Sequence, residues 1–228
     1  MTASSEPIRG LVAPVERATM TEVFRRFRDA NPEPKGELEH VNAYTLLVAV
    51  VLSAQSTDAG VNKATRRLFE IADTPEKMLA LGEEGLREHI KTINFFNTKA
   101  KNVIGLSRRL LEDHGGTVPA SVEILETLPG VGRKTASVVV NMAFGIPRIA
   151  VDTHIFRVSN RIPFVQTSSP LETQDELERI VPDEFMLHAH HWLILHGRYI
   201  CKARRPECWR CPVADLCAYE PKTPAPAG

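Results

Sequence analysis

The chain has 228 residues and a mass of 25.4 kDa, a length that accommodates one large or two small domains. Lysine and arginine total 28, as do aspartate and glutamate, so the formal net charge is zero, while 43% of the residues are hydrophobic. This composition is typical of a globular protein and excludes a collagen-like chain, a globally disordered chain and a disulfide-knot scaffold.

The N-terminal stretch, residues 1–16, contains serine, proline and glutamate and lacks the apolar core of a secretory signal. We interpret it as a flexible tail. The longest apolar run extends from Leu46 to Leu52, far short of the roughly 18 residues of a membrane-spanning helix. These features predict a protein that has no contact with a membrane and works in a reducing, cytoplasmic compartment.

Apolar residues recur at spacings of three and four along most of the chain, and almost none alternate with period two, so the sequence predicts an all-α fold. The clearest helical segments are Met20 to Phe27, Ala43 to Leu52, Val61 to Ile71, Ala100 to Leu111 and Ser137 to Phe144. Val138 to Val140 is β-branched, but its window is long enough for a buried helix, to which we assign it. Helix caps are predicted at Thr57, Thr74, Ser121 and Asp152, whose side-chain oxygens can accept hydrogen bonds from free backbone N–H groups.

Charge is segregated along the chain although the net charge is zero. Residues 89–109 and 127–149 carry basic residues and no acidic one, residues 196–211 carry five basic residues against Glu207, and residues 171–184 carry six carboxylates. Such a layout suits a protein with one positive face for a polyanion. Solvated helix faces give the same pattern.

The first motif that could carry chemistry is the turn Leu-Pro-Gly-Val-Gly-Arg-Lys-Thr at 128–135. It is not a Walker A loop, because Arg133 stands where that loop requires a glycine. In a Gly-x-Gly turn between two helices, the glycines reach unusual dihedral angles and allow close approach. The N–H groups that open the second helix can then hold a DNA phosphate without reading sequence. The pattern fits a helix-hairpin-helix over 121–144, and it also fits an ordinary corner between helices.

Lys134 lies near the predicted start of the second hairpin helix, and Asp152 follows that helix. Taken singly, the lysine is a surface residue and the aspartate is a helix cap. Together they form a candidate catalytic pair, because a helix N-terminus or a desolvated pocket favours the neutral, nucleophilic amine of a lysine. The carboxylate would accept a proton or stabilise developing positive charge.

Four cysteines form a compact group with the spacing C-x6-C-x2-C-x5-C: Cys201, Cys208, Cys211 and Cys217. In a reducing compartment such a group is better interpreted as metal ligands than as disulfides. A 4Fe-4S cluster takes four thiolates, whereas zinc ribbons usually contain two C-x2-C pairs and this chain has one. Spacing alone favours an iron-sulfur cluster and leaves zinc, disulfides or free thiols open.

These motifs, in this order, resemble the endonuclease III family of DNA base-excision glycosylases. The resemblance also includes the segments 52–58, 61–65, 150–158 and 191–199, and it extends over residues 21–219. It implies that the cysteines hold a 4Fe-4S cluster. It further implies two helical domains, one a six-helix barrel that carries the hairpin and one built around the cluster, with a DNA-binding groove between them.

From this resemblance we expect a defined domain order. It comprises a flexible tail at 1–16, a helix at 17–37 that packs with the cluster domain, the six-helix barrel at 38–147, the cluster domain at 148–219 and a disordered tail at 220–228.

The resemblance implies a base excision repair enzyme, a bifunctional glycosylase and abasic-site lyase. Lys134 would attack the sugar C1′ of an oxidised pyrimidine nucleotide flipped out of duplex DNA, and Asp152 would assist proton transfer and stabilise the cationic sugar. The Schiff base so formed would permit β-elimination, which cuts the strand 3′ to the lesion without a metal ion. Binding of one continuous duplex by one active site requires only a monomer, associated with the nucleoid.

Residues expected to contact DNA lie in several segments. Gln55 matches the family residue that fills the gap left by the flipped base, and Phe95 occupies the position of a second inserted residue, usually leucine. Asn94-Phe95-Phe96 departs from the common Gly-Leu-Tyr, which leaves lesion and opposite-base preference open. The other expected contacts are Leu128, Gly130, Val131, Gly132, Arg133, His154, Lys202 and Arg204.

Two other function classes fit parts of the sequence. An adenine glycosylase shares the hairpin, aspartate and cluster, but typically lacks the lysine at position 134 and extends through a further C-terminal domain. A DNA-binding module with a structural cluster, or a ferredoxin-type electron carrier, would have no need of the pair formed by Lys134 and Asp152. Loss of function on replacement of Lys134 discriminates an enzyme from a binding module.

Overall fold

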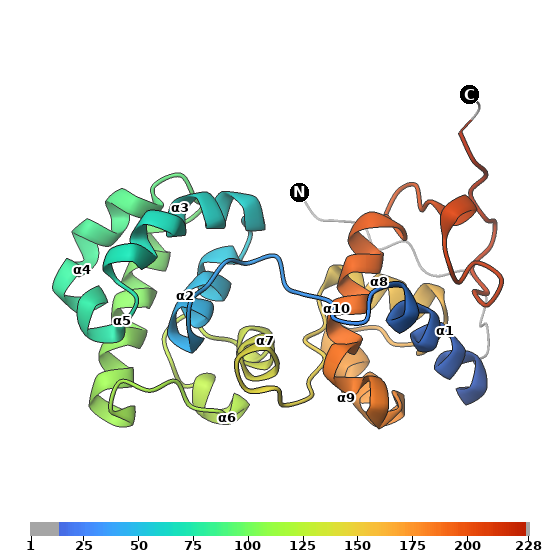
Figure 1. Ribbon diagram of the computed structural model, residues 1–228, viewed down its shortest axis with the longest axis horizontal. Coiled ribbons are helices and arrows are strands. Elements are labelled where there is room, and N and C mark those ends of the chain that lie inside the picture. Colours follow the sequence, from blue (N-terminus) through green and yellow to red (C-terminus); the bar gives the residue numbers. More distant parts are fainter. Residues whose placement is uncertain (1–13, 227–228) are drawn as a thin grey trace. The chain divides into compact units, whose positions relative to one another are not determined.

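The computed structural model describes residues 14–226, which form two compact units. Residues 35–150 make up the first unit, and residues 14–34 with 151–226 make up the second. The chain thus leaves the second unit after one helix and returns to it after residue 150 (Figure 1). All regular structure within 14–226 is helical, so the predicted all-α class is confirmed. Residues 1–13 of the expected N-terminal tail lie outside the described residues.

The first unit contains six helices. They are α2 (Ala43–Ser53), α3 (Asp58–Ile71), α4 (Pro75–Ile90), α5 (Phe96–His114), α6 (Val122–Leu125) and α7 (Arg133–Phe144). Helix α2 contacts α3, α5 and α7, and every side chain from Tyr44 to Leu52 is buried, as expected for a helix that is apolar on all sides. Helix α7 contains Val138 to Val140, so their assignment to a helix is confirmed.

Polar side chains cap helices at each of the four predicted positions. Thr57, Thr74, Ser121 and Asp152 each accept a hydrogen bond from a backbone N–H two or three residues further on, which confirms the four predicted caps. Helix α4 was not predicted from the apolar pattern. Gly82 within it has φ +75°, so two short helical stretches meet there at a kink.

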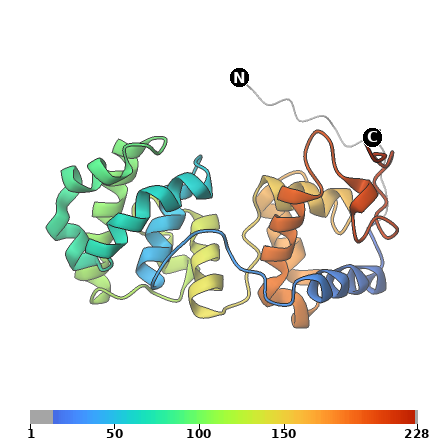
Figure 2. The ribbon, with the colours of Figure 1, turned by 45° about the horizontal axis from the view of Figure 1, so that its top comes forward.

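The second unit contains four α-helices and a 3-10 turn. They are α1 (Arg17–Ala30), α8 (Thr153–Arg161), α9 (Pro170–Ile180), α10 (Asp183–Tyr199) and η1 (Cys208–Arg210). Helix α1 packs against α10, so the N-terminal helix lies beside the C-terminal ones (Figures 1 and 2). The Phe24 ring stacks between Phe164 and Phe185, with centroids 5.5 and 5.6 Å away, and this aromatic cluster holds α1 in the unit.

Helix α10 is unusual because three histidines on it are buried: His190, His191 and His196. Burial lowers the pKa of His191 and His196 to about 4, so both rings are neutral at pH 7. Polar residues on the buried face conceal the helical pattern, which is why this helix was not among the predicted segments.

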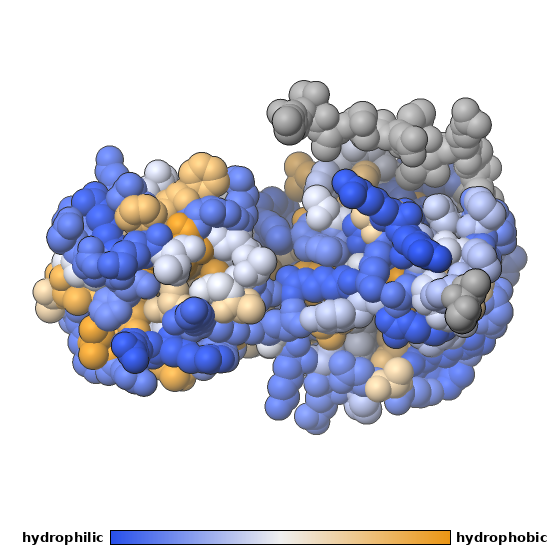
Figure 3. Space-filling view, turned by 90° about the horizontal axis from the view of Figure 1, so that it is seen from above, coloured by the Kyte–Doolittle hydropathy of each residue, from blue (hydrophilic) through white to orange (hydrophobic). Residues whose placement is uncertain are grey.

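The molecular surface seen in Figure 3 is mainly hydrophilic, with hydrophobic residues scattered over it. None of the helices found between residues 14 and 226 combines the length and apolarity needed to cross a membrane.

Candidate active site and metal centre

The hairpin connects α6 to α7 through residues 126–132. Gly130 has φ +76°, and a Cβ there would lie 2.7 Å from the Asn102 Nδ2 and 2.8 Å from the Asn102 Cβ, so this position requires glycine. Gly132 has φ −100° and open space around it. The expectation that both glycines adopt unusual dihedral angles therefore holds for Gly130 and is wrong for Gly132.

Two residues expected to contact DNA in the hairpin, Leu128 and Val131, have buried side chains that belong to the core of the first unit. At these two positions, only main-chain atoms are thus available for contact with DNA. Helix α7 begins at Arg133 with Gly132 as its N-cap, which supplies no side-chain cap. Lys134 is exposed and lies in the first turn of this helix.

Asp152 is the N-cap of α8. Its Oδ1 accepts hydrogen bonds from the backbone N–H groups of His154 and Ile155, both at 2.9 Å, and these bonds fix the orientation of the carboxylate. The simple interpretation of Asp152 as a cap is therefore confirmed. A cap with a fixed, partly exposed carboxylate is also compatible with a chemical role.

His154 is half-buried at the start of α8. Its Nδ1 lies 3.2 Å from Arg157 Nη2, and its Cβ packs against Gly197 of α10, where an added Cβ would approach to 2.8 Å. Arg157 also donates to the carbonyls of Gly197 and Cys201, at 2.8 and 2.9 Å. Sequence reasoning missed Arg157, which connects the start of α8 to the first cysteine.

Gln55 and Phe95 are both exposed, and Phe95 retains 62% of its accessible surface. They are the only non-glycine residues between 14 and 226 with positive φ, at +55° and +57°. A left-handed backbone is uncommon for a non-glycine residue and is an outlier for a bulky one. Such backbone conformations cluster at functional sites, where the surrounding structure holds them.

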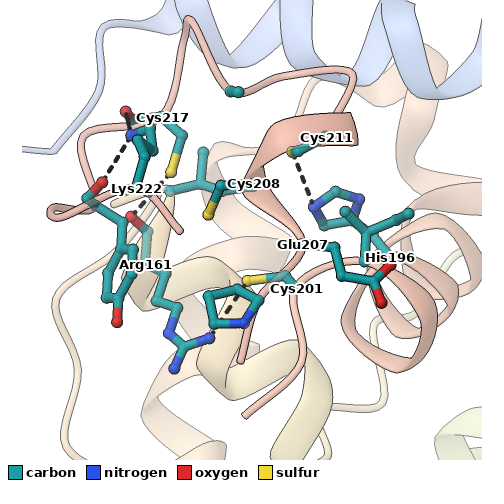
Figure 4. Close-up of a pocket in the computed structure, with 13 residues that line it drawn as sticks. Arg161, His196, Cys201, Glu207, Cys208, Cys211, Cys217 and Lys222 are labelled. Carbon is teal, nitrogen blue, oxygen red and sulfur yellow. Dashed lines mark hydrogen bonds between the residues drawn. The ribbon is translucent and has the colours of Figure 1, made fainter. Parts of the chain in front are cut away.

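All four cysteine thiols line one cavity in the segment that follows α10, together with Arg161, His196 and Lys222 (Figure 4). In the described part of the chain, no three Cys, His, Asp or Glu side chains are close enough to share one metal ion. A 4Fe-4S cluster binds each thiolate through a different iron, so a set of cysteines spread around one cavity fits a cluster better than a single zinc ion.

The chemistry of this donor set also fits a cationic centre. Burial raises the pKa of the Cys211 thiol to about 11, and the three neighbouring cysteines contribute to the shift. Burial likewise raises the pKa of Cys217. Burial thus disfavours an uncompensated thiolate at Cys211 and at Cys217, and a metal centre would supply the compensating positive charge.

Polar groups surround the cysteines (Figure 4). Arg161 Nη1 lies 3.6 Å from Cys201 Sγ, and His196 Nε2 lies 3.7 Å from Cys211 Sγ. Lys222 Nζ donates to the backbone carbonyl of Cys217 at 2.5 Å. Lys222 belongs to the segment that the sequence assigned to a disordered tail, yet it contributes to the cavity wall.

The basic residues of the cysteine segment differ in their partners. Lys202 and Arg210 both form ion pairs with Glu207. Arg204 and Arg205 are exposed and form no ion pair or hydrogen bond with the described residues. Arg204 is thus a stronger candidate for a phosphate contact than Lys202.

The comparisons with known proteins agree with this geometry. Residues 48–183 match the model of the HhH-GPD superfamily of base excision DNA repair proteins, and residues 201–217 match the iron-sulfur binding domain of endonuclease III. The chain is 54% identical to endonuclease III of Haemophilus influenzae, over 88% of this chain and 95% of the relative. It is 52% identical to endonuclease III of Escherichia coli, over 91% of this chain and 99% of the relative.

Solved structures give the same result. A trapped endonuclease III-DNA covalent intermediate superimposes with a TM-score of 0.83 and 44% sequence identity, over 90% of this chain and 96% of that chain. A thermostable thymine-DNA glycosylase superimposes with a TM-score of 0.75 and 26% identity, over 89% of this chain and 95% of that chain.

Proposed function

The chain belongs to the endonuclease III family, within the HhH-GPD superfamily of base excision DNA repair proteins, and from this premise we propose that Lys134 and Asp152 carry its chemistry. Membership makes the protein a base excision repair DNA glycosylase that also cleaves abasic sites and carries a 4Fe-4S cluster. The cluster would be held by Cys201, Cys208, Cys211 and Cys217, and it stabilises the segment that they span.

One observation supports the assignment of Lys134 most directly. Its exposed side chain lies in the first turn of α7, directly after the hairpin turn and its Gly130. A helix N-terminus attracts phosphate, so a DNA strand bound there would place its sugars beside this amine. No other lysine of the first unit lies at the start of a helix that follows a Gly-x-Gly turn.

In the proposed reaction, the neutral Lys134 amine forms a bond to C1′ of the flipped nucleotide as the bond between C1′ and the base breaks. The base leaves with the electron pair of that bond and takes up a proton. The lysine nitrogen then loses a proton, and its lone pair forms the C=N bond of a Schiff base as the bond from C1′ to the ring oxygen breaks. The ring oxygen leaves with the electron pair of that bond and takes up a proton. Removal of a C2′ proton then expels the 3′ phosphate oxygen, which cuts the strand.

Asp152 would accept the proton that Lys134 loses and stabilise the positive charge that develops on the sugar. Its two backbone hydrogen bonds keep the carboxylate in one orientation during this step. A conformationally fixed carboxylate costs no reorganisation when charge develops.

We propose oxidised pyrimidines and abasic sites in double-stranded DNA as the substrates, and a monomer as the active form. One similar structure is a trapped covalent complex of endonuclease III with DNA, which supports a covalent route for this relative. Gln55 and Phe95 would insert into the duplex, and Gly132, Arg133, His154, Lys202 and Arg204 would contact it nearby. We place the enzyme in the cytoplasm, at the nucleoid.

Borohydride trapping tests the proposal. Purified protein, in EDTA, is incubated with a duplex that carries one thymine glycol, and borohydride is added to reduce any Schiff base to a stable crosslink. The wild type is compared with Lys134→Ala and Lys134→Arg on a denaturing gel. Arginine keeps the positive charge, and thus phosphate binding, but is not a nucleophile at neutral pH.

We expect the wild type to form the crosslink and the strand break, and both variants to lose them while Lys134→Arg still binds the duplex. Base release without a crosslink in the wild type would instead indicate a glycosylase without lyase chemistry. Binding with neither reaction would identify a DNA-binding module, in which Lys134 only contacts phosphate.

A further inference from the structure

The two residues proposed to insert into DNA lie on different turns that are tied together by one side chain. Asn94 Nδ2 donates a hydrogen bond of 2.8 Å to the backbone carbonyl of Gln55, 39 residues away in sequence. The acceptor is a carbonyl, so the Asn94 group facing it is the amide NH2. Asn94 directly precedes Phe95, and the bond therefore joins the Gln55 turn to the Phe95 turn.

A second contact holds the same turn from the interior. Lys99 is 5% exposed, and its Nζ donates to the Leu52 carbonyl at 2.8 Å and to Ser56 Oγ at 3.0 Å. Leu52 lies in the last turn of α2, where a cation satisfies backbone carbonyls that have no partner within the helix. Lys99 thus bonds to residues before and after Gln55, and Asn94 bonds to the carbonyl of Gln55 itself.

The backbone of both turns requires such support. Gln55 and Phe95 have φ values of +55° and +57°, a conformation that is unfavourable for residues with a side chain. Neither turn contains a glycine that would adopt this conformation freely. Without the contacts from Asn94 and Lys99, each turn could relax independently and the distance between the two exposed side chains would vary.

We propose that Asn94 is a positioning residue, which fixes the Gln55 turn to the Phe95 turn so that both side chains enter the duplex as one rigid unit. This inference rests on the proposed insertion of Gln55 and Phe95. Asn94 would thereby affect extrusion of the damaged nucleotide from the duplex. It would not affect the chemical steps at Lys134. Extrusion costs most for a paired base and least for a site that has no base to unpair.

The test uses Asn94→Asp and Asn94→Ala in the full-length holoenzyme, both of which lose the donor. Asn94 is exposed, so the protein should fold normally with either substitution. Asn97→Asp is the matched control, because Asn97 is an exposed asparagine three residues further on whose side chain forms no hydrogen bond with the described residues. It adds the same negative charge near the DNA and breaks no contact.

Single-turnover rates are measured with enzyme in excess, on a duplex with thymine glycol opposite adenine and on the same duplex with an abasic site. We expect both Asn94 variants to slow release of the paired base about fivefold, the effect of one hydrogen bond. Incision at the abasic site should change less than twofold, and Asn97→Asp should match the wild type on both duplexes.

A double-mutant cycle with Gln55→Ala completes the test. If Asn94 acts by positioning Gln55, Asn94→Asp should slow the Gln55→Ala enzyme by less than twofold, because the Gln55 side chain that Asn94 positions is absent from that enzyme. Full additivity of the two effects, wild-type rates in both Asn94 variants, or equal slowing on the paired base and the abasic site would each overturn the positioning role.

Failure of the underlying proposal gives a different result. A Gln55→Ala enzyme that releases the paired base at the wild-type rate would remove the premise that Gln55 inserts. A wild-type enzyme that forms no borohydride crosslink would contradict the proposed chemistry at Lys134. A different pattern overturns the inference about Asn94 alone. In that pattern Gln55→Ala releases the paired base slowly, whereas Asn94→Asp releases it at the wild-type rate.

Discussion

The two units of the molecule hold their candidate functional groups in different ways. Within residues 14–226, every residue with positive φ lies in the 35–150 unit, and three of these residues, Gln55, Phe95 and Gly130, are candidate DNA contacts. Asn94, which directly precedes the N-cap Phe95 of helix α5, and Lys99 within α5 both bond to the Gln55 turn, while Asn102 of α5 packs against Gly130. Backbone conformation and packing therefore shape the candidate DNA-contacting turns of this unit.

In the other unit, arginines reach from the helices to the backbone of the cysteine segment. Arg26 of α1 donates to the Pro212 carbonyl at 2.9 Å, Arg157 of α8 to Cys201, and Arg161 to the carbonyls of Lys202 and Ala203, both at 2.7 Å. The segment has little regular structure of its own. Its shape depends on side chains that bond to its carbonyl groups from outside, and on the cluster that we propose its cysteines hold.

Removal of one cluster ligand should give the largest effect. We expect Cys208→Ser to abolish binding of the cluster and to destabilise the second unit by about 4 kcal/mol or more, because the cysteine segment loses its main crosslink. Iron and sulfide content and thermal unfolding measure both effects. The control is Val213→Ala, a buried residue of the same segment, which should lose about 2 kcal/mol and keep a full complement of iron. Full iron content in Cys208→Ser, or zinc in place of iron in the wild type, would contradict the assignment.

The two glycines of the hairpin allow a sharper comparison, because they differ in backbone conformation and in the space available for a side chain. We expect Gly130→Ala to cost about 2 kcal/mol of stability, since φ is +76° and the new Cβ would meet Asn102. Gly132→Ala should change stability by less than about 0.5 kcal/mol, because its φ is negative and its surroundings are open. Denaturant unfolding of the two variants measures the difference.

Binding of duplex DNA by the same two variants separates folding from recognition. If the backbone at Gly132 approaches a phosphate, Gly132→Ala should raise the Kd several-fold although the protein is as stable as the wild type. An unchanged Kd in this variant would show that phosphate is held elsewhere. Equal loss of stability in both variants would show that the hairpin turn differs from the one described.

Arg161→Lys tests the arginine contacts of the second unit. A lysine cannot span the Lys202 and Ala203 carbonyls together or stack over Tyr219, where the guanidinium carbon lies 4.7 Å from the ring centroid. We expect a loss of about 1–2 kcal/mol in denaturant unfolding. Arg179→Lys, in an exposed ion pair with Glu176, should stay within about 0.5 kcal/mol of the wild type. Equal losses in the two variants would show that Arg161 has no special role.

Four helices of the first unit were predictable because burial there is aliphatic, whereas α4, interrupted at Gly82, was not. Leucine, valine and isoleucine at helical spacing reveal α2, α3, α5 and α7 directly, and the β-branched run in α7 is long enough to be recognised as helix. Helix α10 of the second unit was missed because histidines occupy part of its buried face. Histidines count as polar in a hydrophobic pattern, although burial keeps His191 and His196 neutral.

The candidate catalytic and metal-binding residues were predictable from residue types and their order, but the residues that hold the candidate functional segments in place were not. Lys134, Asp152 and the four cysteines stand in recognisable motifs. Asn94 and Arg157 act through contacts between segments far apart in sequence, and no local pattern identifies them. Lys99, in contrast, could have been identified from the sequence. It lies on the apolar face of α5 with Val103 and Leu106, and a lysine in such a position is expected to be buried and to bond to a partner.

The smallest expected effect concerns the basic residues of the cysteine segment. Glu207 already neutralises Lys202, whereas Arg204 has no such partner, so Arg204→Ala should weaken DNA binding more than Lys202→Ala. In a plot of log K against log salt concentration, loss of Arg204 should reduce the slope by about 1, and loss of Lys202 by clearly less. Glu207→Gln provides the complementary change, because it releases Lys202 and should steepen the slope. Equal slopes for the two alanine variants would show that the ion pair opens when DNA binds, and that the contacts seen in the free protein do not determine which charges meet phosphate.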